Sequence, residues 1–288
     1  MSGTRCRRAA VLGSLAAVSL LATNVPPAYA RADAPSAGAG AAARTFSHPT
    51  VIDNRFLPFA PGTKFVLEGR VDDSPHQVVL IVTDLVKVIN GVPTVVLWDR
   101  DFSDGQLAEA ELAFQAQDDA GTVWNFGEYP EEYEDGQFVG APSTWIDGVD
   151  GAQAGIHMLA EPRVGTHSYV QGYSPTIDFL DVAKVFKTDK RLCVGGRCYT
   201  GVLVIDEWSP LDPDSGHQLK YYAPGVGNIK IGAAGGVQQE FLDLVSVSRL
   251  SEAGLAQARS AALRLDRRAY RVSEVYRSTP PAECGDCR

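Results

Sequence analysis

Turn residues divide this chain into short β-branched runs, and their spacing restricts the possible folds more than any other feature. Asn90-Gly91 separates the apolar runs 86–89 and 94–98, and Asn-Gly is one of the strongest signals for a two-residue hairpin. Runs about 8–12 residues apart with turns between them are typical of antiparallel sandwiches and barrels. The sequence therefore predicts a mainly β fold, either an antiparallel barrel or a half-open barrel/sandwich. The strands are expected within residues 64–68, 77–83, 86–89, 94–98, 107–117, 122–126, 137–139, 201–208, 219–223 and 239–247.

The first thirty residues have the layout of a secretory signal peptide. Arg5, Arg7 and Arg8 precede an apolar run over 9–21, and Ala28-Tyr29-Ala30 offers a small-x-small cleavage site. The apolar run is shorter than the roughly 20 residues that span a bilayer. We therefore expect a secreted, extracytoplasmic protein with no transmembrane segment in the mature chain. The arginine pair leaves twin-arginine export as an alternative to Sec export.

One helix is expected after the strands. Ser251 suits an N-cap and Glu252 suits the first turn, and apolar residues recur at helical spacing as far as Ala269. Pro280 ends any continuation. The expected organisation is a signal peptide (1–30), a flexible leader (31–45), a β domain (46–250), one C-terminal α-helix (251–277) and a tail (278–288).

Charge is unevenly distributed along the chain. The net charge is −9 at pH 7, and loss of the three signal arginines would make it −12, so no nucleic-acid partner is expected. Residues 99–150 contain fourteen Asp or Glu and one Arg, whereas 251–277 contain six Arg and three acids. The arginines of the helix either dock on the acidic hairpins or on anionic lipid, or form a solvated face above a buried Leu/Ala stripe.

A first cysteine pair is predicted to form a disulfide across a hairpin. Gly195-Gly196 reads as a two-residue turn, so that Val194 and Arg197 close it and Cys193 and Cys198 form the next pair. That pair is non-hydrogen-bonded, which brings its Cα atoms to about 4.5 Å, within disulfide range. The bond is expected to hold the hairpin rather than act as a redox centre.

Cys284 and Cys287 form a C-x-x-C close to the end of the chain. The pair follows two prolines instead of opening a helix after a strand, which is where a redox C-x-x-C normally lies. A second disulfide is therefore expected, with a metal-binding or thiol-exchange role as the alternative.

A segment near the end of the β region resembles a known family. Trp208-Ser209-Pro210-Leu211 leads to Lys220-Tyr221-Tyr222-Ala223-Pro224-Gly225-Val226-Gly227, and this pattern is similar to exported bacterial β-rich proteins of unknown function. The likeness covers roughly residues 52–232; it implies a secreted β-rich fold and brings no catalytic assignment. The Tyr-Ala-Pro-Gly-x-Gly phrase also has a looser likeness to the half-open barrels of envelope lipoprotein carriers.

Catalytic residues are not identified by any motif. The chain has neither a G-x-S-x-G elbow nor an H-E-x-x-H helix. Buried acids beside aromatic residues can serve as general acids, which makes four residues candidates for acid/base chemistry. No cofactor and no metal site are predicted, because neither His157-Met158 nor the Asp-Gly turns supply a full ligand set. The acid/base candidates are Asp206, Glu207, Asp178 and His157.

Aromatic residues on or next to the expected strands suggest a ligand cavity, since small-molecule sites are concave and mostly apolar. The alternative is an aromatic core without a cavity. We expect a protein that binds an apolar small molecule, a lipid or an envelope partner. A cavity enzyme acting on an apolar substrate and a purely structural surface protein are the alternatives. The predicted ligand-binding residues are Trp98, Trp124, Phe126, Tyr173, Trp208, Tyr221 and Tyr222.

Overall fold

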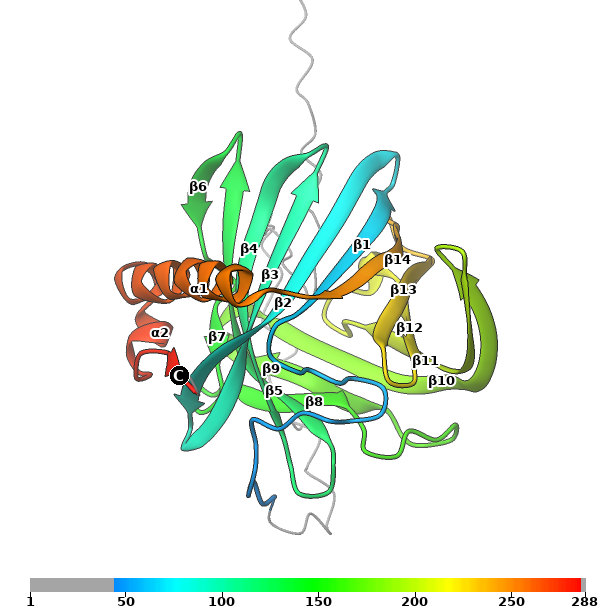
Figure 1. Cartoon of the computed structure of the whole chain (residues 1–288), viewed down its shortest axis with the longest axis horizontal. Coiled ribbons are helices and arrows are strands. Elements are labelled where there is room, and N and C mark those ends of the chain that lie inside the picture. The colour runs from blue at the N-terminus through cyan, green and yellow to red at the C-terminus, as the bar shows by residue number, and fades with distance from the viewer. Residues whose placement is uncertain (1–43, 286–288) are drawn as a thin grey trace, which may run out of the picture.

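Twelve antiparallel strands form a closed barrel in the computed structural model, which describes residues 44–285. The predicted signal peptide, most of the leader and Cys287 lie outside the described residues. The sheet closes because the first strand pairs with the second on one side and with the fourteenth on the other. In Figure 1 the turns near residues 72–73, 104–105 and 135–136 lie together at the upper end of the barrel. The strands are β1 (Thr63–Val71), β2 (Ser74–Ile89), β3 (Val92–Ser103), β4 (Gln106–Gln117), β5 (Val123–Glu134), β6 (Gln137–Gly140), β7 (Trp145–Ile146), β8 (Gln153–Met158), β9 (Tyr169–Ser174), β10 (Phe179–Val194), β11 (Arg197–Trp208), β12 (His217–Ala223), β13 (Gly227–Ala234), β14 (Glu240–Arg249) and β15 (Glu283–Cys284).

Three of the short strands lie off the closed circuit. β6 and β7 pair with β5, and β15 pairs with β2. Two 3-10 turns, η1 (Pro175–Ile177) and η2 (Pro213–Ser215), precede β10 and β12. The fold is thus a closed barrel, the first of the architectures that the turn spacing allowed.

The hairpins follow the predicted turn chemistry. At the β2–β3 turn, Ile89 pairs with Val92, and Asn90 and Gly91 have φ angles of 48° and 80°. Two consecutive residues with positive φ define the type I′ turn, whose twist matches that of the flanking strands. The expected runs 77–83 and 86–89 are one strand, because the register with β3 shifts between Val82 and Val86 without ending the pairing.

The C-terminal helix α1 (Glu252–Val272) packs across the outer face of β2–β5 (Figure 1). Ser251 caps it by accepting a hydrogen bond from the Gly254 backbone N–H, as predicted. The short helix α2 (Glu274–Arg277) follows and brings Tyr276 into the same contact. The buried residues of this outer core include Leu85, Ile89, Val96, Leu112, Phe114, Tyr129, Ala262, Leu265, Ala269 and Tyr276.

Ion pairs join α1 to the acidic strands beneath it. The Arg268 Nε lies 2.8 Å from a carboxylate oxygen of the buried Glu131 on β5, and Arg259 pairs with Asp84 on β2. The helix therefore docks on acidic strands through part of its arginines, while its Leu/Ala stripe is buried. Docking of arginines on acidic residues and a buried Leu/Ala stripe, which the sequence offered as alternatives, are therefore both present.

The segment before β1 crosses the lower end of the barrel in Figure 1, opposite the β1–β2, β3–β4 and β5–β6 turns. Asn54 fixes it there: the side-chain amide donates to the carbonyls of Gly121 and Leu159, at 2.9 and 3.1 Å, and its oxygen accepts from the Phe56 and Leu57 N–H groups. This crossing brings Leu57 into the barrel interior.

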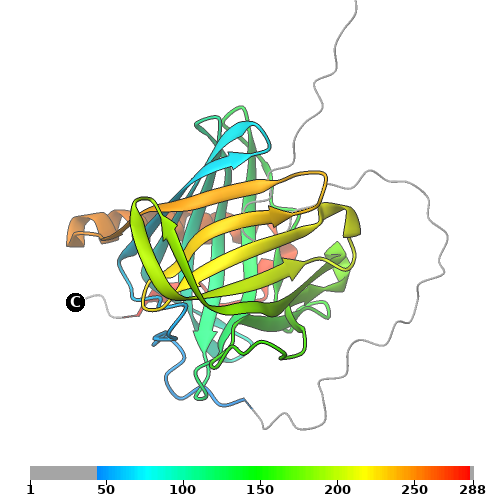
Figure 2. The same ribbon diagram turned by 90° about the vertical axis from the view of Figure 1, so that its right-hand side faces the viewer.

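The β10–β11 hairpin carries the predicted disulfide, and its tip packs against β14 with Val194 buried in the core. Cys193 and Cys198 are register partners and are joined, with their Cα atoms 3.9 Å apart, so that prediction is confirmed. Cys284 is also disulfide-bonded; Cys287, with which it was predicted to pair, is not among the described residues. Figure 2 shows the wall formed by β11–β14, with α1 behind it.

Candidate functional site

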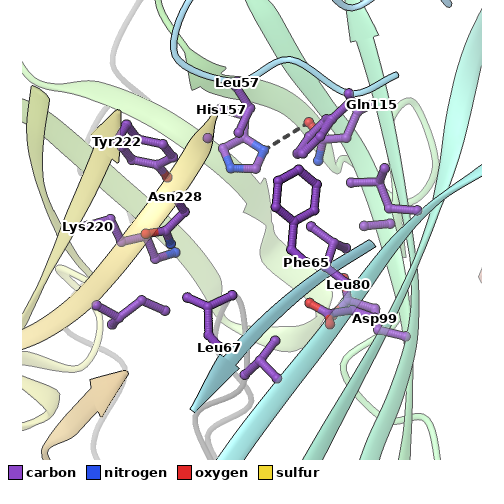
Figure 3. Close-up of a pocket in the computed structure, with 17 residues that line it drawn as sticks. Leu57, Phe65, Leu67, Leu80, Asp99, Gln115, His157, Lys220, Tyr222 and Asn228 are labelled. Carbon is purple, nitrogen blue, oxygen red and sulfur yellow. Dashed lines mark hydrogen bonds between the residues drawn. The ribbon is translucent and has the colours of Figure 1, made fainter. Parts of the chain in front are cut away.

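A cavity of about 90 Å³ lies inside the barrel. Its walls come from strands on opposite sides and from the crossing segment (Figure 3). One part of the lining is apolar and the other is polar and charged, so the cavity is amphipathic. The apolar lining is formed by Leu57, Phe59, Phe65, Leu67, Val78, Leu80, Leu97, Ala113, Tyr222 and Ile231, and the polar lining includes Asp99, Glu111, Gln115, His157, Lys220 and Asn228.

The alternation of side chains along β3 produces this change of character. Successive strand residues face opposite sides of a sheet, and Val96 belongs to the outer core under α1. Leu97 and Asp99 line the cavity on the inner face. Asp101, two residues further on, shares that face. The inner side of β3 therefore passes from apolar to acidic toward the β3–β4 hairpin.

The neighbouring strand β4 repeats this pattern and places acid opposite acid. Asp99 is the register partner of Glu111, and Asp101 is the register partner of Glu109. All four side chains are buried. Like charges directly opposite one another destabilise a sheet, so this arrangement is unfavourable for folding alone. We call these four residues the acid wall.

Further buried carboxylates face the same interior. Among the described residues they outnumber the cations there, which are Lys220 and, when protonated, His76 and His157. Lys220 is engaged, because its Nζ lies 2.7 Å from an oxygen of Glu207. The interior is thus strongly acidic. Its buried carboxylates are Asp99, Asp101, Glu109, Glu111, Glu128, Asp181, Glu207 and Glu240.

Burial and mutual repulsion shift the pKa values of several of these acids upward. Burial holds the pKa values of Glu109 and Glu111 well above the ordinary value, and neighbouring carboxylates add to the effect. Burial also raises the pKa of Glu128 to about 8, although Asn125 and Trp145 donate hydrogen bonds to it. Several inner acids therefore hold a proton near neutral pH.

The same desolvation acts on Asp181 and Lys220. Burial raises the pKa of Asp181 to about 7, helped by the charge of Glu207 and opposed by Lys220. For Lys220, burial works against the charged form, but the carboxylates of Glu207, Glu240 and Asp181 outweigh it and raise its pKa. Lys220 therefore stays cationic, and its ammonium group is paired with the Glu207 carboxylate.

His157 stands at the junction of the apolar and polar lining. Its Nδ1 lies 3.0 Å from the Gln115 Oε1 (Figure 3), and burial, helped by the charge of Lys220, lowers its pKa to about 3. It is therefore neutral at physiological pH. Because Gln115 presents an oxygen, Nδ1 carries the proton and Nε2 is left as an acceptor.

A second histidine lies deeper, next to the acid wall. The Nε2 of His76 is 3.7 Å from a carboxylate oxygen of Asp101 and 3.7 Å from one of Glu240, which is longer than a hydrogen bond. Both ring nitrogens of His76, one oxygen of Asp101 and one of Glu240 are buried without a hydrogen-bond partner. Buried polar groups are usually paired, so this group of atoms is unusual.

Of the predicted ligand-binding residues, Tyr222 lines the cavity. The other six predicted ligand-binding residues do not line this cavity. Trp98, Trp124 and Phe126 belong to the outer core beside α1, where Arg100 lies over the ring of Trp98. These three lie on outward-facing positions of strands whose outer face is covered by a helix.

The remaining three aromatic candidates are spread over other parts of the barrel. Tyr173 is half-buried on β9, and Trp208 stacks on His217 with ring centroids 5.2 Å apart. Tyr221, adjacent to Tyr222, has Lys190 over its ring.

The four acid/base candidates are likewise split between the cavity and other parts of the barrel. His157 lines the cavity and Glu207 is paired with a lining residue, Lys220. Asp206 instead pairs with His217 and Lys184, both partly exposed, so one member of the Asp206-Glu207 pair faces inward and the other outward. Asp178 is exposed and ends η1 with a φ of 50°.

Sequence reasoning missed the acid wall, Gln115 and Lys220. The available signal was the two-residue spacing of Asp99 with Asp101 and of Glu109 with Glu111, which places each pair on one face of a strand. The spacing does not reveal whether that face of the strand points into the barrel or away from it.

Between residues 44 and 285, no helix combines the length and apolar character needed to cross a membrane. No three or more His, Cys, Asp or Glu side chains in that range are arranged to hold a metal ion.

Comparisons with known proteins add little to these observations. No protein-family model matches the chain, and no curated protein matches it. One similar solved structure is a protein classed as exported, with a YmcC-like fold, from Bacteroides fragilis; it is 12% identical, covers 68% of this chain and 100% of its own, and has a TM-score of 0.40. Another is a protein classed as a lipoprotein from Parabacteroides distasonis, 13% identical, covering 68% and 99%, with a TM-score of 0.40. At this level of similarity neither supports an inference about the role of the chain.

Proposed function

We propose that this chain is an extracytoplasmic protein that binds an apolar small molecule inside its barrel. The observation that carries the proposal is the cavity of about 90 Å³, with Leu57, Phe59, Phe65 and Leu97 in its apolar wall. Concave, mostly apolar sites with a few placed polar groups are the usual form of small-molecule sites. An apolar cavity of about 150 Å³ binds benzene, so this smaller cavity of about 90 Å³ suits a short alkyl chain.

Two independent features favour the location outside the cytoplasm. The first thirty residues have the order of a secretory signal, and the Cys193–Cys198 disulfide belongs to an oxidising compartment. Cell fractionation with the full chain tests the location. A protein that stays cytoplasmic with Cys193 and Cys198 reduced would contradict it.

The binding proposal is tested by filling the cavity. Ala113 lines it, so Ala113→Leu places three further carbon atoms in the space a ligand would occupy. We expect 1-hexanol to raise the melting temperature of the wild-type protein and to have at most one-tenth of the wild-type affinity for the variant. Ala253→Leu, at an exposed position on α1, is the matched control and should bind 1-hexanol normally.

Native mass spectrometry of the exported protein gives the complementary result. An extra mass that is lost on denaturation would identify the natural ligand. The proposal fails if the protein carries no extra mass and the wild-type protein does not respond to 1-hexanol or to any other small apolar probe.

A second candidate function is acid catalysis in the same cavity. Glu111 lines the cavity, and burial and nearby carboxylates raise its pKa, which is the environment of many general acids. Prolonged incubation of the loaded protein separates the two functions. A released ligand of unchanged mass supports binding, whereas a product that is formed by the wild type and not by Glu111→Gln supports catalysis.

A further inference from the structure

We propose that the ligand carries a hydroxyl group, which donates a hydrogen bond to the Nε2 of His157 and accepts one from the hydroxyl of Tyr222. The inference rests on the proposed function, because both side chains line the same cavity. It narrows the ligand from an apolar molecule to a short-chain alcohol whose alkyl part lies against Phe65 and Leu97.

The imidazole of His157 is held with one ring nitrogen bonded and the other free. Its Nδ1 lies 3.0 Å from the Gln115 Oε1, and the ring of Phe59 packs edge-on against it with centroids 6.3 Å apart. An amide oxygen only accepts, so Nδ1 is the donor and Nε2 is the acceptor. Among residues 44–285, no group donates a hydrogen bond to this Nε2.

Tyr222 supplies a second polar atom to the cavity. Its side chain is 1% exposed, and its hydroxyl has no hydrogen-bond partner in the described part of the chain. Buried tyrosine hydroxyls usually have a partner. Figure 3 shows the hydroxyl end of Tyr222 and the ring of His157 pointing into the same space. They are not hydrogen-bonded to each other, so the space between them suits a group that bonds to both.

A hydroxyl group has the hydrogen-bonding capacity that these two atoms require. It offers one donor, which the Nε2 of His157 needs, and two acceptor lone pairs, which suit the Tyr222 hydroxyl as a donor. An ether or ketone oxygen only accepts and would leave Nε2 unpaired. A buried polar atom without a partner carries its full desolvation cost, so the cavity should discriminate between the two kinds of oxygen.

Charges around His157 favour an uncharged donor. Asp99 and Glu111 line the same cavity and repel an anionic head group. Lys220 also lines it, near enough for its charge to help lower the pKa of His157, so a ligand cation at His157 meets a like charge. A neutral hydroxyl avoids both conflicts.

The test compares 1-hexanol with 1-methoxypentane, isomers that contain the same atoms and differ in having a hydroxyl or an ether oxygen. Isothermal titration calorimetry with the wild-type protein at pH 7 measures both affinities. The Kd of 1-hexanol should be about tenfold lower than that of 1-methoxypentane, because the ether leaves one buried acceptor unpaired.

Three variants assign the effect to residues. His157→Phe keeps an aromatic ring and removes Nε2, so it should lose about tenfold in hexanol affinity and bind the ether as the wild type does, which also shows that it is folded. Tyr222→Phe removes a donor that both oxygens accept, so both affinities should fall by a similar factor. His167→Phe, at an exposed position, is the matched control and should bind both isomers normally.

NMR of the histidine side chains tests the contact without any substitution. In a long-range ¹H–¹⁵N correlation spectrum, the Nε2 of His157 should have the shift of an unprotonated ring nitrogen. It should move upfield when 1-hexanol is added and stay in place with 1-methoxypentane. A protonated Nε2 in the free protein would overturn the inference.

The outcomes separate the two proposals. If neither isomer binds, the proposed function fails. If the ether binds as tightly as hexanol, the cavity binds apolar molecules and the hydroxyl inference is overturned. A preference for hexanol that persists in His157→Phe overturns the role of His157, because another group then receives the hydroxyl proton. If His157→Phe binds neither isomer, the wild-type NMR shift decides: movement with hexanol alone supports the contact, and no movement overturns it.

Discussion

The two faces of strands β2–β4 bury charge in opposite ways. On the outer face, the Lys87 Nζ donates to the Asp266 Oδ1 at 3.0 Å, to the Tyr270 hydroxyl at 2.9 Å and to the Pro280 carbonyl at 2.7 Å. The Tyr276 hydroxyl donates a further hydrogen bond to the Asp266 Oδ1 at 2.7 Å. On the inner face of the same strands, Asp99 faces Glu111 and Asp101 faces Glu109.

The difference separates a buried ion pair that the fold itself completes from a buried group in which like charges face one another. The outer pair is complete: each charge has an opposite charge and hydrogen bonds, which is the condition under which a buried ion pair is tolerated. The inner group differs, because acids oppose acids and atoms of His76, Asp101 and Glu240 lack hydrogen-bond partners. Residues that break folding rules are expected at functional sites.

The largest effect is expected from breaking the outer pair. Lys87→Met leaves the buried Asp266 carboxylate without its cation, which costs about 3–5 kcal/mol of unfolding free energy. Denaturant unfolding monitored by tryptophan fluorescence measures the loss. The double variant Lys87→Met with Asp266→Leu should recover most of it, because replacing a whole buried pair by apolar residues is often neutral. No recovery would mean that the lysine acts through Tyr270 and Pro280 instead.

A pH-dependent effect is expected on the inner side. Burial raises the pKa of Glu240 to about 8, with repulsion from Asp101 and Asp99 opposed by Lys220; His76 and Gln218 are its other neighbours. The unfolded chain loses this proton near pH 4.5, whereas the folded chain keeps it until about pH 8. Stability should therefore fall as pH rises through this window, by about 1 kcal/mol per pH unit for one such group.

Glu240→Gln should remove that part of the slope, while Glu68→Gln at an exposed site should leave it intact. The measurement is the free energy of unfolding at pH 5, 6, 7 and 8. An unchanged slope in Glu240→Gln would mean that Glu240 is ionised in the folded protein.

A third region, the tip of the β10–β11 hairpin, combines a cross-strand disulfide with the buried Val194, which belongs to the main hydrophobic core. Its disulfide closes a loop with a sequence separation of 5, for which the chain-entropy estimate is about 2 kcal/mol. Cys193→Ser with Cys198→Ser should lower the free energy of unfolding by that amount and leave hexanol binding unchanged. A loss of binding would show that the hairpin reaches the cavity.

The smallest effect is expected from an exposed ion pair. The Lys230 Nζ lies 2.6 Å from an Asp243 oxygen, and both side chains are partly exposed. Surface pairs contribute about 0–1 kcal/mol. Lys230→Ala should therefore change the melting temperature little. A large shift would contradict the account, because an exposed ion pair would then contribute as much to stability as a buried one.

Local features of the fold were predictable from the sequence because they depend on a few adjacent residues. Asn90-Gly91, the Cys193–Cys198 pair and the Ser251 N-cap each act over fewer than ten residues, and each is observed. Strand β13, between Gly227 and Ala234, was not expected, because its glycines and lysine weaken the strand pattern.

The candidate site was less predictable because alternation gives a face without telling which face is inside. Along β4, apolar Ala110, Leu112 and Phe114 alternate with Glu109 and Glu111. A sheet with one solvated face would place the acids in water. Here α1 covers the apolar face, so the acids point into the barrel. Trp98 and Trp124 were expected at a cavity because they lie on predicted strands. Both side chains instead belong to the outer core.

The stability of Glu111→Gln at pH 8 tests the contrast between the two faces most directly. Burial and nearby carboxylates raise the pKa of Glu111, so ionisation at pH 8 favours the unfolded chain. Replacing Glu111 by the neutral Gln should therefore raise the free energy of unfolding by about 1 kcal/mol or more at pH 8. The gain should shrink as the pH falls and vanish at about pH 3, well below the ordinary glutamate pKa of 4.5, where the carboxyl is protonated in both states. A variant that is less stable than the wild type at pH 8 would contradict this, because it would mean that Glu111 is already paired within the fold.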